Sequence, residues 1–184
     1  DRIFSSESDP KKRDPERLEK ARFAMMVALL RKPAGKTNDA RKWLAWLEYE
    51  TGRFEEAIRH YEALRRADPT DAELLQRLAD AALRLDDTKR ALEYYEMLAR
   101  IVPESDRAFP SIAQTIADLH RRNGSPCRGA SWFSKAYRDD PSKVADKPDE
   151  LVLIGSLFAE CGDMDEADKW LEADDESVGA ELTR

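Results

Sequence analysis

The segment GRFEEAIRHYEALRRADP, residues 52–69, decides the fold, because its pattern returns later in the chain. After 34 residues, DDTKRALEYYEMLARIVP, residues 86–103, places an alanine, a tyrosine and a proline in the same positions. Fainter versions follow at intervals of 38 residues, around Gly124 and Gly162. Such a period is typical of helical repeat arrays, in which each unit buries its apolar face against its neighbours. The sequence therefore predicts a chain built from successive similar units.

Each unit is predicted to be a pair of antiparallel helices. Apolar residues recur every three or four positions from Leu74 to Leu85 and again from Ala91 to Leu98, which is the spacing of one buried helix face. Thr70 and Asp163 stand at N-cap spacing before a glutamate. Glycines end several first helices, where a left-handed residue is easiest for glycine: Gly52, Gly124 and Gly162. We expect helices over 15–32, 39–50, 54–67, 71–85, 88–101, 108–122, 126–138, 148–161 and 164–173.

The predicted fold is all-α: an α-solenoid of about four antiparallel hairpins preceded by one helix. The array covers residues 15–173, in units of about 15–36, 38–71, 72–105, 108–143 and 147–173. Residues 1–14 form a polar lead that we expect to lack fixed structure. Residues 174–184 form an acidic tail or the start of a missing repeat. Because the chain starts at Asp1 rather than Met, we expect a piece of a longer array.

Composition narrows the classes of partner. Charged residues make up 38% of the 184 residues, and the formal net charge is −7. Thirteen acidic and three basic side chains fall in residues 145–184, so the acidity belongs to the C-terminal part. A general nucleic-acid binder needs a basic surface to replace phosphate counterions, which argues against nucleic acid as a partner. The longest near-unbroken apolar run, residues 23–30, is far shorter than the roughly 20 residues of a membrane span.

The repeated residues resemble a known family, the tetratricopeptide repeat. The residues that carry the resemblance in one unit are Leu44, Ala45, Gly52, Phe54, Ala57, Tyr61, Leu64 and Pro69. Residues 72–103 and 147–171 are similar, and the likeness covers roughly 16–172. For the last two units the related SEL1-like repeat is an alternative, although its glycine-rich loop is absent.

Three positions depart from the family pattern, and they put the local shape of the groove in question. Glu48 stands where an aromatic residue is commoner, Asp86 replaces a glycine, and Arg41 replaces a large apolar residue.

The resemblance implies a concave groove, lined by the first helices, that holds a protein or peptide partner. The groove residues that it implies are Lys42, Trp46, Tyr49, Glu50, Gln76, Asp80, Leu83, Arg84, Gln114, Asp118, Arg121 and Arg122. Exposed aromatics such as Trp46 are favoured binding anchors. The alternative is that Trp43 and Trp46 pack against the helix before them. Likewise, Arg121 and Arg122 either contact an acidic peptide or compensate a helix dipole.

The sequence predicts no catalytic machinery, no cofactor and no metal. Gly35-Lys36-Thr37 resembles the tail of a phosphate loop, but the first glycine and the preceding strand are missing. His60 and His120 lie on different hairpins without a matching nucleophile. A zinc site at His120, Cys127 and Cys161 lacks a fourth ligand. We therefore expect a protein that is not an enzyme.

Cys127 and Cys161 are predicted to lie on the same edge of neighbouring elements. They form either a disulfide, which implies an oxidising compartment such as a bacterial periplasm, or two unbonded thiols. The compartment stays open between cytoplasm and periplasm, and the cysteine pair favours the periplasm.

Three functions fit these observations. The first is a non-enzymatic scaffold that binds a partner polypeptide in the groove of a multiprotein assembly. The second is a bacterial envelope scaffold of an exopolysaccharide export or secretion system, which docks a modifying enzyme or an outer-membrane pore. The third is the regulatory repeat region of a larger enzyme or sensor. Apolar surface at Trp170 and Leu171, left without a capping helix, is a candidate for self-association through the array ends.

Overall fold

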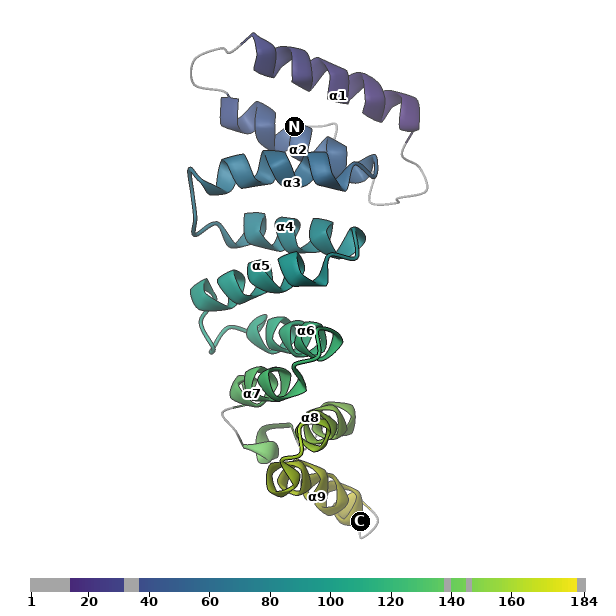
Figure 1. Ribbon diagram of the computed structural model, residues 1–184, viewed down its shortest axis with the longest axis vertical. Helices are drawn as coiled ribbons and strands as arrows, with labels where there is room; N and C mark the ends of the chain where they lie inside the picture. The colour runs from purple at the N-terminus through teal and green to yellow at the C-terminus, as the bar shows by residue number, and fades with distance from the viewer. Residues whose placement is uncertain (1–13, 32–36, 138–139, 145–146, 182–184) are drawn as a thin grey trace. The chain divides into compact units, whose positions relative to one another are not determined.

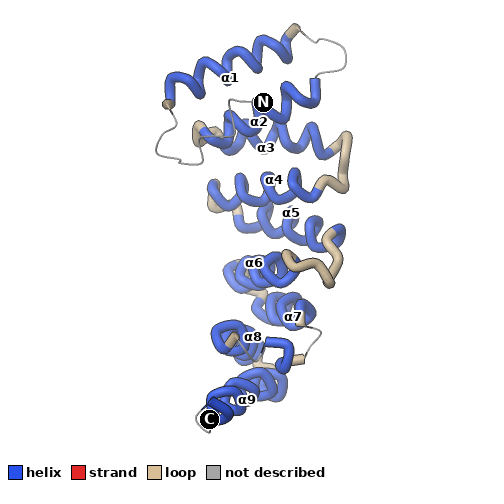
Figure 2. The backbone as a smooth tube through the Cα atoms, turned by 180° about the vertical axis from the view of Figure 1, so that it is seen from behind, coloured by secondary structure: helices blue, strands red, loops and turns tan. Residues whose placement is uncertain are grey.

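The computed structural model describes residues 14–31, 37–137, 140–144 and 147–181. Within these ranges all regular structure is helical and no strand occurs (Figure 1, Figure 2). The elements are α1 (Pro15–Leu30), α2 (Thr37–Glu50), α3 (Phe54–Arg65), α4 (Ala72–Arg84), α5 (Thr88–Ile101), α6 (Phe109–Arg122), α7 (Pro126–Ala136), the 3-10 helix η2 (Pro141–Val144), α8 (Pro148–Glu160) and α9 (Met164–Glu181). The predicted all-α fold is confirmed.

Two elements differ from the prediction. Helix α9 continues to Glu181 instead of ending at residue 173, so the expected acidic tail is helical as far as that residue. No glycine or proline stands between Leu171 and Val178 to end the helix. The short helix η2 follows α7, where the sequence predicts only a connection. The predicted polar lead and the Gly35-Lys36 pair lie outside the described residues, apart from Asp14.

The chain divides into two compact units, residues 1–87 and 88–184. The predicted hairpin of 72–105 therefore gives α4 to the first unit and α5 to the second, and its pairing stays a prediction. We describe each unit by itself.

In the first unit, consecutive helices from α1 to α4 pack against one another. The buried residues follow helical spacing: Leu44 and Leu47 on α2, Ala57 and Tyr61 on α3, and Leu75, Leu78 and Ala82 on α4. Their apolar faces form the core, because each helix turns one stripe inward. The unit is therefore a stack of amphipathic helices, as the repeat pattern predicts.

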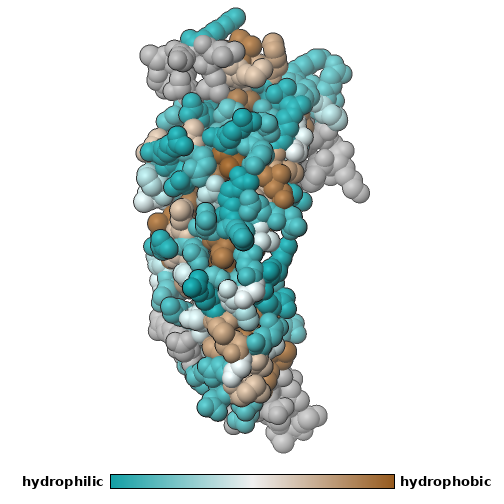
Figure 3. Space-filling view, in the orientation of Figure 1, coloured by the Kyte–Doolittle hydropathy of each residue, from teal (hydrophilic) through white to brown (hydrophobic). Residues whose placement is uncertain are grey.

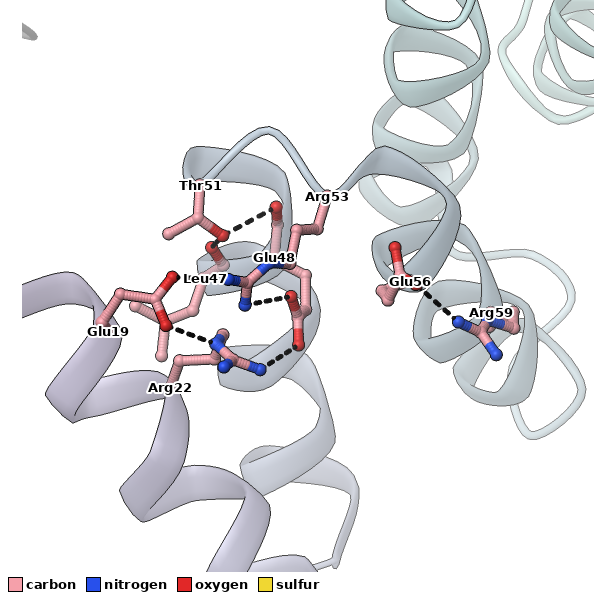
Figure 4. A network of polar contacts seen from close by, with 8 residues as sticks. All are labelled: Glu19, Arg22, Leu47, Glu48, Thr51, Arg53, Glu56 and Arg59. Carbon is pink, nitrogen blue, oxygen red and sulfur yellow. Dashed lines mark hydrogen bonds and ion pairs between the residues drawn. The ribbon is translucent and has the colours of Figure 1, made fainter. Parts of the chain in front are cut away.

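An ion-pair network around the buried carboxylate of Glu48 joins α1 to α2 and to the turn before α3 (Figure 4). The carboxylate of Glu48 on α2 lies 3.4 Å from Arg22 on α1 and 3.7 Å from Arg53, and its side chain is 5% exposed. Glu19 on α1 accepts from Arg53 at 2.8 Å and from Arg22 at 3.0 Å. Glu48 therefore replaces the family's aromatic residue with a charge that two arginines compensate.

In the second unit, α6 packs tightly on α7, and α8 on α9. A Cβ atom on Gly129 of α7 would lie 2.6 Å from the carbonyl oxygen of Ala117 on α6. A Cβ atom on Gly155 of α8 would lie 2.7 Å from the Leu171 side chain on α9. At Gly129 the neighbour is backbone, so only glycine permits this approach, whereas at Gly155 the neighbour is a side chain. The small residue predicted at Gly129 is confirmed as a close-packing position.

One expectation about the apolar end is wrong. Trp170 is fully buried, with 0% exposure, so its indole belongs to the core of the second unit. Leu171 is 36% exposed. An exposed patch that contains both side chains is thus absent, because α9 folds Trp170 inward. Self-association through the ends of the chain stays a prediction.

The helix ends confirm four predicted turn or cap residues and correct a fifth. Gly52, Gly124 and Gly162 all have positive φ, as the prediction requires. The carboxylate of Asp163 accepts from the Glu166 N–H at 3.3 Å, which confirms it as a cap. Thr70 does not cap α4: the Asp71 carboxylate accepts from the Leu74 N–H at 3.0 Å instead. Thr70 turns back to bond the side chain of Asp68.

Candidate functional site

A pocket of about 520 Å³ opens in the first unit. Its lining comes from three helices: Asp39, Lys42, Trp43 and Trp46 of α2, Tyr61 of α3, and Glu73, Leu74 and Arg77 of α4. We call it the aromatic pocket.

Helical periodicity brings these side chains together. Positions 39, 42, 43 and 46 lie three, four and seven residues apart, so they share one face of α2. On α4, Glu73 and Arg77 are four residues apart and lie on one face, beside Leu74. Tyr61 reaches the pocket from α3, which packs against both α2 and α4. The pocket therefore follows from the packing of α2 and α4, the first helices of two predicted units, against α3, the second helix of one of them.

Two indoles form the apolar wall of the aromatic pocket. The rings of Trp43 and Trp46 meet edge to face, with centroids 6.1 Å apart and planes at 90°. Trp43 is 41% exposed, and Trp46 is half-buried. Exposure of so large an apolar ring is costly in water, and covering it would contribute to binding.

Tyr61 is a buried part of the pocket lining and carries an unused polar atom. The residue is 2% exposed, and its hydroxyl has no hydrogen-bond partner among the described residues. Burial raises the pKa of Tyr61 to about 12, so the hydroxyl stays protonated at neutral pH. Buried hydroxyls normally have a partner, because an unpaired one costs about 1–3 kcal/mol. One side chain of the pocket lining therefore carries an unsatisfied donor.

The rim of the pocket carries two charges of each sign. Glu73 accepts from Lys42 Nζ at 3.5 Å and from Arg77 at 3.5 Å. These contacts are long, and the side chains of Lys42 and Glu73 are 55% and 59% exposed. Exposed pairs of this kind contribute about 0–1 kcal/mol. The rim charges can therefore turn toward another molecule at little cost.

Of the predicted groove residues in the first unit, the pocket contains Lys42 and Trp46. Farther along α2, Tyr49 packs edge to face on Phe54 with centroids 5.4 Å apart. A hydrogen bond to Tyr49 raises the pKa of Arg84 on α4, so these two side chains meet between the same two helices. The remaining predicted groove residues of the first unit differ in exposure: Gln76 is exposed, and Glu50, Asp80 and Leu83 are half-buried.

The predicted groove residues of the second unit lie on α6. Gln114 and Arg122 are exposed. Arg121 pairs with Asp118 at 3.1 Å and approaches Glu160 of α8 at 3.9 Å. Both arginines stand in the last turn of α6, where positive charge compensates the helix dipole.

The two histidines have different surroundings. His60 on α3 is half-buried, and burial lowers its pKa. His120 is buried on α6, with Nε2 3.2 Å from a carboxylate oxygen of Glu96 on α5. Among the described residues, no three His, Cys, Asp or Glu side chains are placed to hold a metal ion. The same part of the chain contains no helix long and apolar enough to cross a membrane.

Sequence reasoning missed most of the pocket. Glu73 and Arg77 had a signal, because they flank Leu74 at helical spacing opposite Lys42. One alternative from the sequence is that Trp43 packs against the helix before it, whereas the structure places Trp43 in the pocket lining with Trp46. Tyr61 had no signal, because its position in the repeat is typical of a core aromatic residue.

Comparison with known proteins agrees with the fold. The family model for the tetratricopeptide repeat matches residues 43–106. No curated protein sequence matches the chain significantly. The crystal structure of MamA is 17% identical, with a TM-score of 0.61 over 95% of this chain and 96% of that one. YrrB, described as a TPR protein with an unusual peptide-binding site, is 18% identical, with a TM-score of 0.58 over 91% and 84%.

A third similar structure is BtubC from P. vanneervenii, which is 18% identical, with a TM-score of 0.56 over 91% of this chain and 76% of that one. At these identities the likeness shows the fold alone, and that fold is the predicted α-solenoid. Proteins of this fold are generally non-catalytic scaffolds for protein–protein interaction. The repeat period and the helical fold agree with the family match: residues 43–106 are similar to the tetratricopeptide repeat, and the similar solved structures share the helical-repeat fold.

Proposed function

We propose that this protein is a non-enzymatic scaffold that binds an extended segment of a partner polypeptide, anchored by one large side chain in the aromatic pocket. The observation that carries the proposal is the buried Tyr61 hydroxyl, which has no partner within the described residues. An unsatisfied donor on a side chain that lines the pocket is costly in the free protein. A ligand that accepts its hydrogen bond would remove that cost.

The chemistry of the wall selects the anchor. Trp43 and Trp46 offer apolar ring surface, so the anchor is aromatic or a large aliphatic side chain. The pocket volume of about 520 Å³ is within the range of sites that bury small ligands, about 300–1,000 Å³. The Tyr61 hydroxyl donates a hydrogen bond to an oxygen of the segment, which belongs either to its backbone or to the tip of the anchor.

The rim selects the neighbours of the anchor. Asp39 and Glu73 balance Lys42 and Arg77, so a segment with charges of both signs fits better than a uniformly acidic or basic one. These pairs contribute more to register and association rate than to affinity. The segment that fits the aromatic pocket thus combines an apolar anchor with polar residues on both sides of it.

The other predicted groove residues extend this proposal. Tyr49 and Arg84 lie between α2 and α4, beyond the pocket, and would contact the continuing segment. Gln114, Asp118, Arg121 and Arg122 of the second unit are proposed as separate contacts on α6. YrrB is described as a peptide-binding protein of the same fold, which supports a peptide as the class of ligand.

Selection from a random-peptide phage library tests the proposal. We expect the parent protein to enrich a consensus with one large apolar residue. Synthetic consensus peptide should bind Trp43→Ala at least about tenfold more weakly than the parent protein, as expected for an interface anchor. Trp132→Ala is the matched control, because Trp132 is a half-buried tryptophan of the second unit. Lack of enrichment, or equal binding by Trp43→Ala, would refute the aromatic pocket as the binding site.

A further inference from the structure

Two cysteines meet in the second unit, where α7 begins and α8 ends. Cys127 is the second residue of α7, and Cys161 directly follows the last residue of α8. The Cys127 thiol donates to the carbonyl oxygen of Cys161, with Sγ and O 3.9 Å apart. A hydrogen bond with Cys127 is also the largest cause that raises the pKa of the Cys161 thiol. The two sulfur atoms are therefore neighbours, although 34 residues separate them in sequence.

The surrounding packing fixes both helix ends. Gly129 holds α7 against the backbone of α6, where any larger residue would collide with Ala117. The Cys161 N–H donates to the Phe158 carbonyl at 3.1 Å, and Gly162 turns the chain with φ of +82°. Arg121 of α6 and Glu160 of α8, the residue before Cys161, approach to 3.9 Å. The thiols are therefore held in place rather than brought together by loose loops.

The chemistry of the pair points to sulfur–sulfur bonding. A structural zinc site needs four ligands, and among the described residues no third metal-binding side chain joins these two. Both thiols are free. Cys127 is exposed and Cys161 is half-buried, so a small molecule can reach the first more easily than the second. Thiol–disulfide exchange requires just this access.

We propose that Cys127 and Cys161 are a thiol–disulfide exchange site, which a small disulfide such as oxidised glutathione converts to an intramolecular disulfide. The bond would tie the hairpin of α6 and α7 covalently to the hairpin of α8 and α9. This proposal is independent of the aromatic pocket, which lies in the other unit.

The exchange runs in two balanced steps. Cys127 loses its proton, its thiolate attacks one sulfur of oxidised glutathione, and one glutathione thiolate leaves with the electron pair of the broken bond. Cys161 then loses its proton and attacks Sγ of Cys127, and the second glutathione thiolate leaves. The protein has lost two hydrogen atoms, and one glutathione disulfide has become two glutathione thiols. Excess reduced glutathione reverses both steps.

Intact mass spectrometry in glutathione buffers tests this site. The full chain is equilibrated at increasing ratios of oxidised to reduced glutathione, acid-quenched and alkylated with N-ethylmaleimide. We expect the parent protein to lose two hydrogen atoms and to take up neither maleimide nor glutathione in the oxidised buffers. Digestion with trypsin should then release a peptide that contains Cys127 joined to one that contains Cys161.

Single variants supply the controls. Cys161→Ser lacks the second thiol, so we expect Cys127 to retain bound glutathione, with an occupancy at least about tenfold above that of the parent protein. In guanidinium chloride, which unfolds the chain, the parent protein should need a more oxidising buffer to form the bond. A parent protein that keeps its glutathione, forms linked dimers or stays reduced in oxidised glutathione would overturn the proposal. Equal bond formation with and without guanidinium would also overturn it, because the fold would not present the pair.

Discussion

Replacing Tyr61 with phenylalanine removes one oxygen atom from the aromatic pocket and leaves the ring in place. In the free protein the residue is 2% exposed, and its hydroxyl has no partner among the described residues. Its pKa of about 12 keeps it a neutral donor at physiological pH. The substitution therefore measures what this one atom does, first in the free protein and then in the complex.

The substitution is expected to stabilise the free protein and to weaken its binding of the partner segment. An unpaired buried hydroxyl costs about 1–3 kcal/mol, so its removal should raise the free energy of unfolding by about 0.5–1 kcal/mol once the small void is counted. In the proposed complex the hydroxyl donates to an oxygen of the bound segment. Losing that hydrogen bond should weaken binding by about 1–2 kcal/mol, which is about 5- to 30-fold in Kd.

Urea unfolding followed by circular dichroism measures the first change, and calorimetric titration with the library-selected peptide measures the second. The matched control is Tyr137→Phe in the second unit. Tyr137 is 6% exposed, but its hydroxyl donates to the Glu150 carboxylate, so this variant should lose stability and keep its affinity for the peptide. If Tyr61→Phe loses stability as Tyr137→Phe does and binds as well as the parent protein, the reasoning about the aromatic pocket is refuted.

Three further substitutions test other parts of the structure. Glu48→Gln removes the buried charge between two arginines and should lower the free energy of unfolding, measured in urea, by about 1–2 kcal/mol. Unchanged stability would contradict this prediction. Gly129→Ala inserts a Cβ atom 2.6 Å from a carbonyl oxygen and should cost about 1–3 kcal/mol by the same measurement, whereas a neutral result would show that α6 and α7 are less closely packed. Burial lowers the pKa of His60 in the folded protein, so the unfolded chain binds a proton at a higher pH than the folded protein does. The free energy of unfolding therefore decreases as the pH is lowered below about 6.5. His60→Gln should therefore lose less stability than the parent protein between about pH 7 and about pH 5.5, and parallel curves would contradict this.

The helices were predictable because their signals are local. Apolar spacing and turn glycines placed most helix ends within two residues of those observed, and the positive φ of Gly52, Gly124 and Gly162 follows from the same pattern. Asp86 shows that the turn itself is required: it adopts φ of +56° where the family has glycine. A repeat pattern thus specifies backbone geometry even where one residue departs from it.

The pocket was less predictable because it depends on tertiary contacts. The sequence indicated Lys42 and Trp46 as groove residues, but it could not show that the Tyr61 hydroxyl would be left without a partner. That depends on which groups surround α3, not on its own spacing. Glu48 is similar: its departure from the family pattern was visible, whereas the two arginines that compensate its charge come from α1 and from the turn before α3.

The central claim is that the aromatic pocket holds the anchor of a partner segment, and the indole N–H signals of the four tryptophans test it most directly. Trp43 and Trp46 line the pocket, whereas Trp132 and Trp170 belong to the second unit. In a nuclear magnetic resonance titration with the selected peptide, we expect the signals of Trp43 and Trp46 to move together and saturate while the other two stay fixed. Movement of Trp132 or Trp170 with Trp43 and Trp46 unchanged would contradict the account.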